Sequence, residues 1–428
     1  MKDKSTAHWR KFFLLGILFY SLSFGAKGTE DYAQTLHQFE PESVKNIDMY
    51  LSSRHGIDQE GQLALQEYHA GVEYTGKLAP KWRTRAGLNL VTENKLDTQT
   101  FTRLEVDTLY AHYEGETCGA RIGVQQVVWG GADRLQVLDV IHPLDLRESY
   151  FGDWQRKRLP LAMLNLECDL AEQSLQLLLV PQSRFNRLPS NQGRFTQSGL
   201  GAKLAPQGVA VVQGDAPHAG NPSDWSGGVQ WRTKVYEGDV TLNLFHGWQG
   251  EHLYRSDGAA YREEPARFNM VGASYTRPIG PLVFRFEGAH TRGIIGYVQD
   301  TVGRLGPVPT RQNSYLIGVD YSNEPWFFSA QLFDRKRTAD QSLSGETRQQ
   351  MITLAVRHSL MQDRLHLTAY AAKDIINSAN YVSLTASHEI RPQLLVSTSL
   401  ERFNGNSNSF GLFAKQSRIV VGFEYHWK

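Results

Sequence analysis

The chain has 428 residues, with 45 lysine and arginine residues against 44 aspartate and glutamate residues. A formal net charge of +1 leaves no basic surplus for nucleic-acid binding, so no nucleic-acid partner is expected. The two cysteines lie far apart and lack the CxxC spacing of a zinc site, and no metal-ligand motif or cofactor motif is evident, so no metal and no cofactor is expected.

The N-terminus has the pattern of a secretion signal. A basic region over 2–11 precedes an apolar stretch over 12–24, and small residues follow at a cleavage site. The apolar stretch is shorter than the ~20 residues that a membrane-spanning helix needs, which disfavours the alternative of an uncleaved anchor. We therefore predict a signal peptide over 1–28, a short periplasmic segment over 29–45 and an exported domain over 46–428.

Apolar and polar residues alternate in strand-length stretches along the exported domain. In the last stretch, Ile419, Val421 and Phe423 fall on one face, whereas Gly422 and Glu424 fall on the other. About eighteen such stretches occur, and sixteen is the alternative because the first is weak. The predicted strands cover 46–54, 62–76, 81–92, 100–114, 117–129, 161–169, 173–181, 226–236, 239–248, 267–277, 281–291, 313–322, 326–335, 350–360, 363–373, 380–390, 393–403 and 417–427.

The apolar faces carry aromatic residues near their ends, which is typical of strands that face lipid. The links between the strands alternate between tight turns and long polar segments, as in barrels with short periplasmic turns and long external loops. We therefore predict an all-β, transmembrane antiparallel β-barrel in the outer membrane of a Gram-negative cell, with both termini periplasmic. Such a barrel has outer-membrane lipid and the barrel-assembly machinery as partners.

Side-chain parity assigns the two faces of each strand. In the stretch 100–114, Leu104, Val106, Thr108 and Tyr110 are expected to face lipid. The opposite faces carry charges of both signs, which either line a water-filled pore or form ion pairs that fill the barrel. The candidate pore-lining residues are Arg83, Arg85, Arg103, Glu105, Asp107, Arg121, Arg232, Lys234, Arg285 and Glu287.

The alternation stops between Val128 and Leu161. The segment 130–160 is too apolar for a solvated loop and too irregular for a strand, so we expect it to fold into the lumen and narrow it; an external cap is the alternative. The link 182–225 is instead expected to be a long external loop. The candidate constriction residues are Asp133, Arg134, Asp139, Asp145, Arg147 and Glu148.

Several motifs in this region resemble a porin-like family of Gram-negative outer-membrane proteins catalogued as a domain of unknown function. The motifs are Gln125–Gly130 (QQVVWG), Leu135–Val140 (LQVLDV), Pro143–Glu148 (PLDLRE), Arg158–Glu167 (RLPLAMLNLE), Val180-Pro181 and Arg187–Pro189 (RLP). The resemblance covers about 120–190, and His142 departs from it, because that position is commonly asparagine in the family. Members are often encoded near resistance-nodulation-division type exporters, which implies an inner-membrane exporter system as a partner and hydrophobic compounds as cargo.

Cys118 and Cys168 are expected near the periplasmic rim of neighbouring strands, where they either form a disulfide or remain two separate thiols. No GxSxG motif occurs and no histidine lies in a nucleophile context, so an enzyme is not expected. The sequence therefore favours a channel or transport-assisting barrel for small-molecule solutes, including hydrophobic ones. The alternatives are a sealed structural or receptor barrel that binds a partner through its loops and, less favoured, a lipid-hydrolysing barrel.

Overall fold

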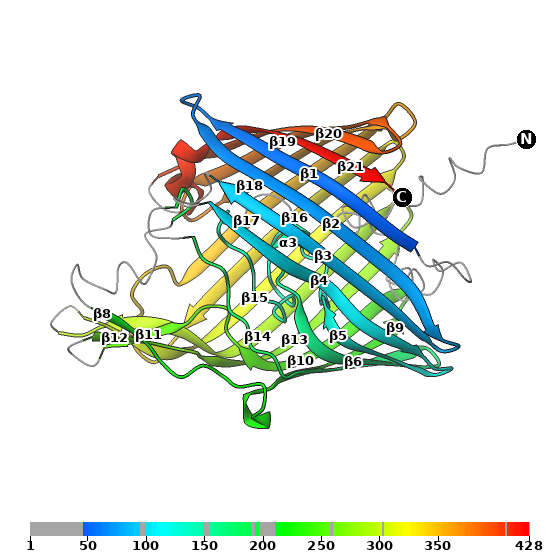
Figure 1. The fold of residues 1–428 in the computed structure, drawn as a ribbon. Helices are drawn as coiled ribbons and strands as arrows, with labels where there is room; N and C mark the ends of the chain where they lie inside the picture. Colours follow the sequence, from blue (N-terminus) through cyan, green and yellow to red (C-terminus); the bar gives the residue numbers. More distant parts are fainter. Residues whose placement is uncertain are drawn as a thin grey trace, which may run out of the picture.

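The computed structural model describes residues 46–94, 100–148, 154–189, 193–196, 210–256, 260–301, 304–406 and 409–427. Eighteen strands form one closed antiparallel sheet, in which β1 pairs with both β2 and β21 (Figure 1). The prediction of an all-β transmembrane barrel of about eighteen strands is confirmed, and the alternative of sixteen is wrong. The predicted signal peptide and the segment 29–45 lie outside the described residues.

The barrel strands follow one another around the wall in chain order. They are β1 (Asn46–Asp58), β2 (Leu63–Ala79), β3 (Trp82–Asn94), β4 (Phe101–Glu114), β5 (Cys118–Gln125), β6 (Leu161–Leu170), β7 (Gln173–Val180), β9 (Ser226–Val235), β10 (Gly238–Trp248), β13 (Arg267–Ile279), β14 (Leu282–Gln299), β15 (Leu305–Asn323), β16 (Trp326–Thr338), β17 (Arg348–Leu360), β18 (Leu365–Asp374), β19 (Ala379–Arg391), β20 (Leu394–Asn404) and β21 (Arg418–Trp427).

Alternation along each strand separates an apolar outer face from an inner face. On β10, Leu242 and Leu244 are 48% and 52% exposed on the outside, whereas Thr241 and Asn243 are buried on the inside. The short turns all lie at the end of the barrel that holds the start of β1 and the end of β21. One of them, Tyr236-Glu237, has positive φ at both residues, as a two-residue turn between twisted strands requires.

The outward assignment of Thr108 and Tyr110 is wrong, because β4 contains a bulge. Gly87 pairs with Thr108 while Leu88 pairs with Val106, so Asp107 is an extra residue that reverses the parity beyond it. Tyr110 therefore pairs with Arg85 on the inner face.

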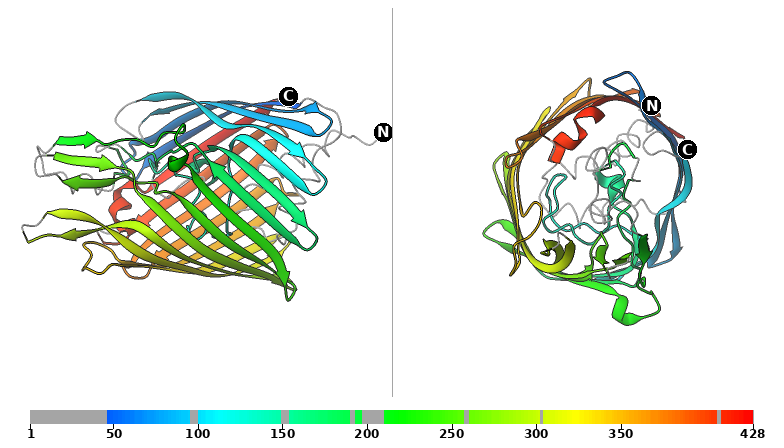
Figure 2. Two further views of the ribbon diagram at one scale, coloured as in Figure 1. Left: turned by 90° about the horizontal axis from the view of Figure 1, so that it is seen from below. Right: turned by 90° about the vertical axis from the view of Figure 1, so that its left-hand side faces the viewer.

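Three short strands lie beyond the long-loop rim (Figure 2, left). In this small sheet β12 (Ala260–Glu264) lies between β8 (Ala210–Gln213) and β11 (Leu253–Ser256). The described chain also contains the short helix α3 (Trp154–Lys157) and the 3₁₀ helices η1 (Pro222–Asp224) and η2 (Ser409–Gln416). No helix among the described residues is long and apolar enough to cross a membrane.

The neighbouring strands β5 and β6 are joined by a disulfide. Cys118 and Cys168 are direct cross-strand partners at the short-turn end, and their sulfur atoms are bonded. Their side chains have the same parity as Ile122 and Leu164, which are exposed on the outer face. The disulfide therefore links the two strands between which the chain enters the lumen.

Candidate functional site

The described chain between β5 and β6 lies inside the barrel. We call residues 126–148 and 154–160 the inward segment; it begins four residues before the predicted boundary, because β5 already ends at Gln125. It lies within the ring of strands in the view along the barrel axis (Figure 2, right). Its contacts reach β14 and β16 on one wall and β1, β3 and β21 on another, so it spans the lumen.

The first half of the inward segment is apolar and buried. Trp129, Val137 and Leu138 are at most 2% exposed, and they belong to one hydrophobic cluster that includes wall residues of β10, β13 and β15. Leu138 lies against Gly272 of β13, where a Cβ atom would be 2.3 Å from the Leu138 Cδ2 atom. Glycine at 272 therefore allows the leucine to lie directly on the wall.

A buried carboxylate fastens this half to β16. The carboxylate of Asp133 accepts hydrogen bonds from Gln331 Nε2 at 2.6 Å and from Ser329 Oγ at 3.2 Å. Arg285 lies 3.4 Å from the same carboxylate but makes a closer pair, 2.6 Å, with Asp320. Burial raises the pKa of Asp133 to about 7, because Arg285 is shared and only partly offsets the loss of hydration.

The Gly130-Gly131 pair fits closely against β14. The Gly131 amide donates a hydrogen bond to the Glu287 carboxylate, and Arg285 donates one to the Gly131 carbonyl. Gly130 has φ +87°, and a Cβ atom there would lie 2.8 Å from a Glu287 oxygen. Both the conformation and the space therefore require glycine at 130.

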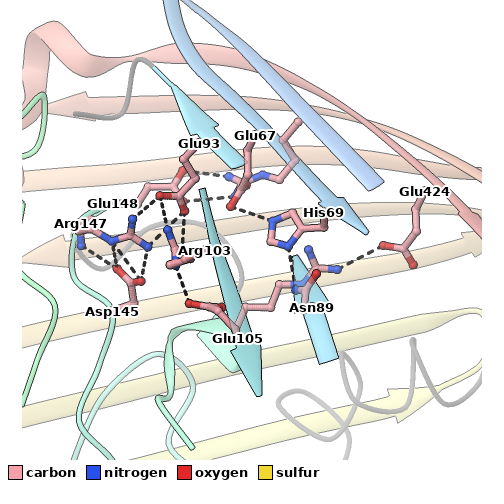
Figure 3. Close-up of polar contacts among 12 residues, drawn as sticks. Glu67, His69, Asn89, Glu93, Arg103, Glu105, Asp145, Arg147, Glu148 and Glu424 are labelled. Atoms are coloured by element: carbon pink, nitrogen blue, oxygen red, sulfur yellow. Dashed lines mark hydrogen bonds and ion pairs between the residues drawn. The ribbon is translucent and has the colours of Figure 1, made fainter. Parts of the chain in front are cut away.

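The second half of the inward segment is charged and faces the opposite wall (Figure 3). Arg147 pairs with Glu93 of β3 and also bonds Asp145, with its Nε atom 2.9 Å from Oδ1. Arg103 of β4 bonds the same Glu93 carboxylate at 2.9 Å and Glu105 at 2.6 Å. Acids and bases thus alternate across two strands and the inward segment.

A second charge network starts at Glu148. This carboxylate accepts from Arg54 of β1 at 2.9 Å and from Arg418 of β21, which is 1% exposed at its side chain. Burial opposes ionisation of Glu148, but the two arginines outweigh it and lower its pKa to about 2. Arg54 and Arg418 also pair with Glu67 and Glu401, at 2.9 Å and 2.6 Å.

Part of the expected external loop 182–225 also enters the lumen, which differs from the sequence expectation. Arg187 forms an isolated parallel β-bridge with Asp145, and the backbone amide of Arg187 donates a hydrogen bond to the Leu144 carbonyl at 2.9 Å. The Arg187 side chain pairs with Glu105. Further on, Phe195 is 1% exposed beside Phe413 of η2. Inside the barrel Arg187 has carboxylate partners and Phe195 an apolar cluster, which explains the difference.

His142 is buried, and both of its ring nitrogens bond backbone groups. Its Nε2 atom accepts a hydrogen bond from the Val127 amide at 2.8 Å, and its Nδ1 atom lies 2.9 Å from the Leu159 carbonyl. Burial lowers its pKa to about 4, so the imidazole is neutral with its proton on Nδ1.

The predicted lining residues fall into two groups. Arg103 and Glu105 belong to the network around the inward segment and the 182–189 stretch, and Arg285 and Glu287 bond the inward segment directly. The other six lie elsewhere on the inner wall: Asp107 is at the bulge, within electrostatic reach of Arg156 of the inward segment, and Lys234 is near the Tyr236 turn. Four of them have wall partners: Arg83–Glu114 at 3.0 Å, Arg85–Glu73 at 2.9 Å, Arg121–Glu167 at 2.6 Å and Arg232–Gln230 at 3.2 Å.

The predicted constriction residues all bond or pack inside the lumen. Asp139 pairs with Arg158 at 2.7 Å, and the guanidinium of Arg134 lies 4.5 Å from the centre of the Tyr370 ring. The sequence prediction missed Arg54, Glu93 and Arg418, which complete the networks. Their inner-face parity is visible in the sequence, but the partners that they have in the inward segment lie 94, 54 and 270 positions away in the chain.

Toward the short-turn end, the inner wall formed by β17 to β20 carries hydroxyl groups. Thr385 and Ser399 lie 2.9 Å apart across β19 and β20, and both are only partly buried. Ser359 of β17 has the same inward parity and lies 3.1 Å from His366. Among the described residues, no group of three or more His, Cys, Asp or Glu side chains is placed to hold a metal ion.

No protein-family model matches the sequence, and no curated protein is similar to it. Among solved structures, the fold is similar to OccK8 (OprE) of Pseudomonas aeruginosa, with a TM-score of 0.51 and 11% identity, over 90% of this chain and 97% of that chain. It is also similar to OccAB1 of Acinetobacter baumannii, with a TM-score of 0.51 and 9% identity, over 90% and 96% of the chains. The fold is therefore that of a porin-like β-barrel.

Proposed function

We propose that the protein is an outer-membrane channel for small polar solutes, narrowed by the inward segment. One observation carries this proposal: the inward segment is bonded to opposite walls, by Asp133 at β16 and by Glu148 at β1 and β21. A solute that crosses the barrel has to pass beside it. The nearest groups are then the guanidinium and carboxylate groups around Arg147, which favour polar over apolar solutes.

The channel role agrees with the porin-like fold, and outer-membrane location agrees with the exposed apolar outer face. A link to an inner-membrane exporter rests on the sequence resemblance alone. The hydrophobic cargo implied by that resemblance is less compatible with the charged network beside the inward segment. We therefore place small polar solutes ahead of hydrophobic ones.

Conductance in a planar bilayer tests the proposal. The folded mature chain should give small, stable conductance steps, and a variant lacking residues 131–157 should give larger ones because the segment that crosses the lumen is gone. Folding of both proteins is checked by heat-dependent mobility on a gel. Silence from both folded proteins would contradict the channel and favour a sealed barrel, consistent with the aromatic cluster of Phe195, Phe403 and Phe413.

Ion selectivity tests whether permeating ions pass beside Arg147. Arg147→Gln leaves Glu93 and Asp145 without one of their cationic partners, so the reversal potential should shift toward cation selectivity. Arg277→Gln is the matched control, because Arg277 lies on the outer face near the short turns and pairs with the exposed Glu237. Equal selectivity of both variants would place the path elsewhere in the barrel.

A further inference from the structure

Four basic side chains meet in two directly opposed pairs on the outer face of the barrel. Arg292 of β14 pairs across the ladder with Arg311 of β15, and Lys336 of β16 pairs with Arg348 of β17. We call these four residues the basic rim. All four are exposed; Lys336 and Arg348 lie at the long-loop ends of β16 and β17, and Arg311 is level with them because it pairs with Thr338, the last residue of β16. Like charges directly opposite each other destabilise an antiparallel pair, so their arrangement calls for a counter-charge.

The outer face next to the basic rim supplies too little negative charge. Asp334 bonds Arg348 at 2.7 Å. Asp340 lies 3.7 Å from Arg311, and the side chains of Asp340 and Arg311 are both largely exposed. Exposed ion pairs of this kind contribute little. Lys373 of β18 and Arg402 of β20 extend the positive charge, because they share the outward parity of Leu367 and Leu400.

Hydrogen bonds orient part of this surface. Asn313 Oδ1 lies 2.7 Å from Nδ1 of His290, and Nε2 of that imidazole accepts from Nε of Arg292 at 3.2 Å. The same Asn–His–Arg arrangement occurs at Asn269, His246 and Arg267. The imidazole of His290 therefore orients the Arg292 side chain along the wall through its Nε atom, whereas Arg267 also donates to the carbonyls of Ser223 and Trp225.

In the opposite sector, the described outward-facing side chains of β2, β3 and β4 near the long loops are uncharged. On β2, Gln66 Nε2 donates to the Tyr68 hydroxyl at 2.8 Å, and on β3 and β4 the hydroxyls of Thr92 and Thr102 lie 3.2 Å apart. These side chains lie on the outer face near the long-loop ends of their strands. Among the described strand residues, the outward positive charge near the long loops therefore lies on one side of the barrel.

We propose that the basic rim binds the phosphate groups of a membrane lipid, a glycolipid with phosphates on its sugar headgroup. A phosphate between two opposed cations neutralises both, and arginine offers paired donors that match phosphate geometry. The outer face just below is apolar, with Ile317, Leu332 and Leu354 each about half exposed, which suits acyl chains. The inference rests on the membrane position in the proposed function but does not depend on conductance.

Lipid binding by the full mature chain in detergent tests this inference. The probe is a diphosphorylated lipid A-type glycolipid, and bound lipid is counted by native mass spectrometry. Replacing all four residues (R292Q/R311Q/K336Q/R348Q) should weaken binding by about fivefold for each charge removed, since each basic residue near an anionic surface contributes on that order. Arg277→Gln, an outward arginine at the other end of the barrel, should bind like the unaltered chain.

Three outcomes would overturn the inference: equal binding by the fourfold variant, equal binding of the dephosphorylated glycolipid, or displacement of the lipid by low concentrations of inorganic phosphate. The last outcome would assign the site to free phosphate. Should the fourfold variant not fold, the double variant R311Q/K336Q takes its place with a proportionally smaller loss. Conductance of the same variants separates the two proposals, because we expect it to be unchanged when the lipid site is lost.

Discussion

The two halves of the inward segment are held in different ways. The half around Leu138 lies in the apolar cluster against β10, β13 and β15, with Asp133 as its buried polar anchor. The half around Arg147 and Glu148 is held by ion pairs to β1, β3 and β21. Apolar burial is insensitive to charge, whereas the networks set the electrostatic field beside the path. In the proposed channel, the first half thus positions the segment and the second sets the ion selectivity.

The largest expected effect comes from breaking the buried network. Arg418→Met leaves Glu148 and Glu401 buried without their shared cation, and we expect a loss of about 3–5 kcal/mol in the free energy of unfolding. Denaturant-induced unfolding in lipid or detergent measures this loss in the free energy of unfolding. Arg277→Met, which breaks an exposed pair, is the control and should cost less than about 1 kcal/mol. Similar losses in both variants would show that the Glu148 network does not stabilise the barrel.

An intermediate effect is expected at the apolar half. Gly272→Val places a side chain where Leu138 Cδ2 would lie 2.3 Å from the new Cβ, at a cost of about 1–3 kcal/mol. The first half of the inward segment should move away from the wall, which hydrogen exchange of residues 131–141 and an increased conductance would report. Gly288→Ala is the control, because its nearest neighbour lies at 3.5 Å. Unchanged hydrogen exchange of residues 131–141 in the valine variant would show that Leu138 does not pack on the wall at Gly272.

The smallest expected effect is a dependence on pH through Asp133. Because burial raises its pKa to about 7, the proton favours the docked segment; this stabilisation is complete below pH about 4 and is lost as the pH rises through about 7. Exchange of residues 131–141 should therefore be faster at pH 8 than at pH 5, and Asp133→Asn should reduce the difference; the buried Glu287 carboxyl, which bonds the Gly131 amide, is the other titratable group that contacts this half. His142 stays neutral over this range, since its pKa is about 4. If the exchange rates at pH 8 and pH 5 differ as much in the asparagine variant as in the unaltered chain, a group other than Asp133 causes the pH dependence.

The pattern of apolar and polar residues along the chain was sufficient to predict the barrel architecture. Period-two alternation and the short–long rhythm of the links predicted the number of strands and the outer faces, because both depend on residues close in sequence. The exceptions show the limit of this reasoning. Tyr110 was assigned to the wrong face because the bulge at Asp107 depends on pairing with Gly87 and Leu88 of the neighbouring strand.

The interior was decided by tertiary structure. The sequence predicted that the segment from 130 onward departs from the barrel pattern and carries charges, yet the pairing of Glu148 with Arg418 joins residues 270 positions apart. The entry of Arg187 and Phe195 into the lumen depends in the same way on partners supplied by β4 and η2. Strand alternation follows from local backbone geometry, whereas the partner of a buried charge is set only when the closed barrel brings distant strands to the same lumen.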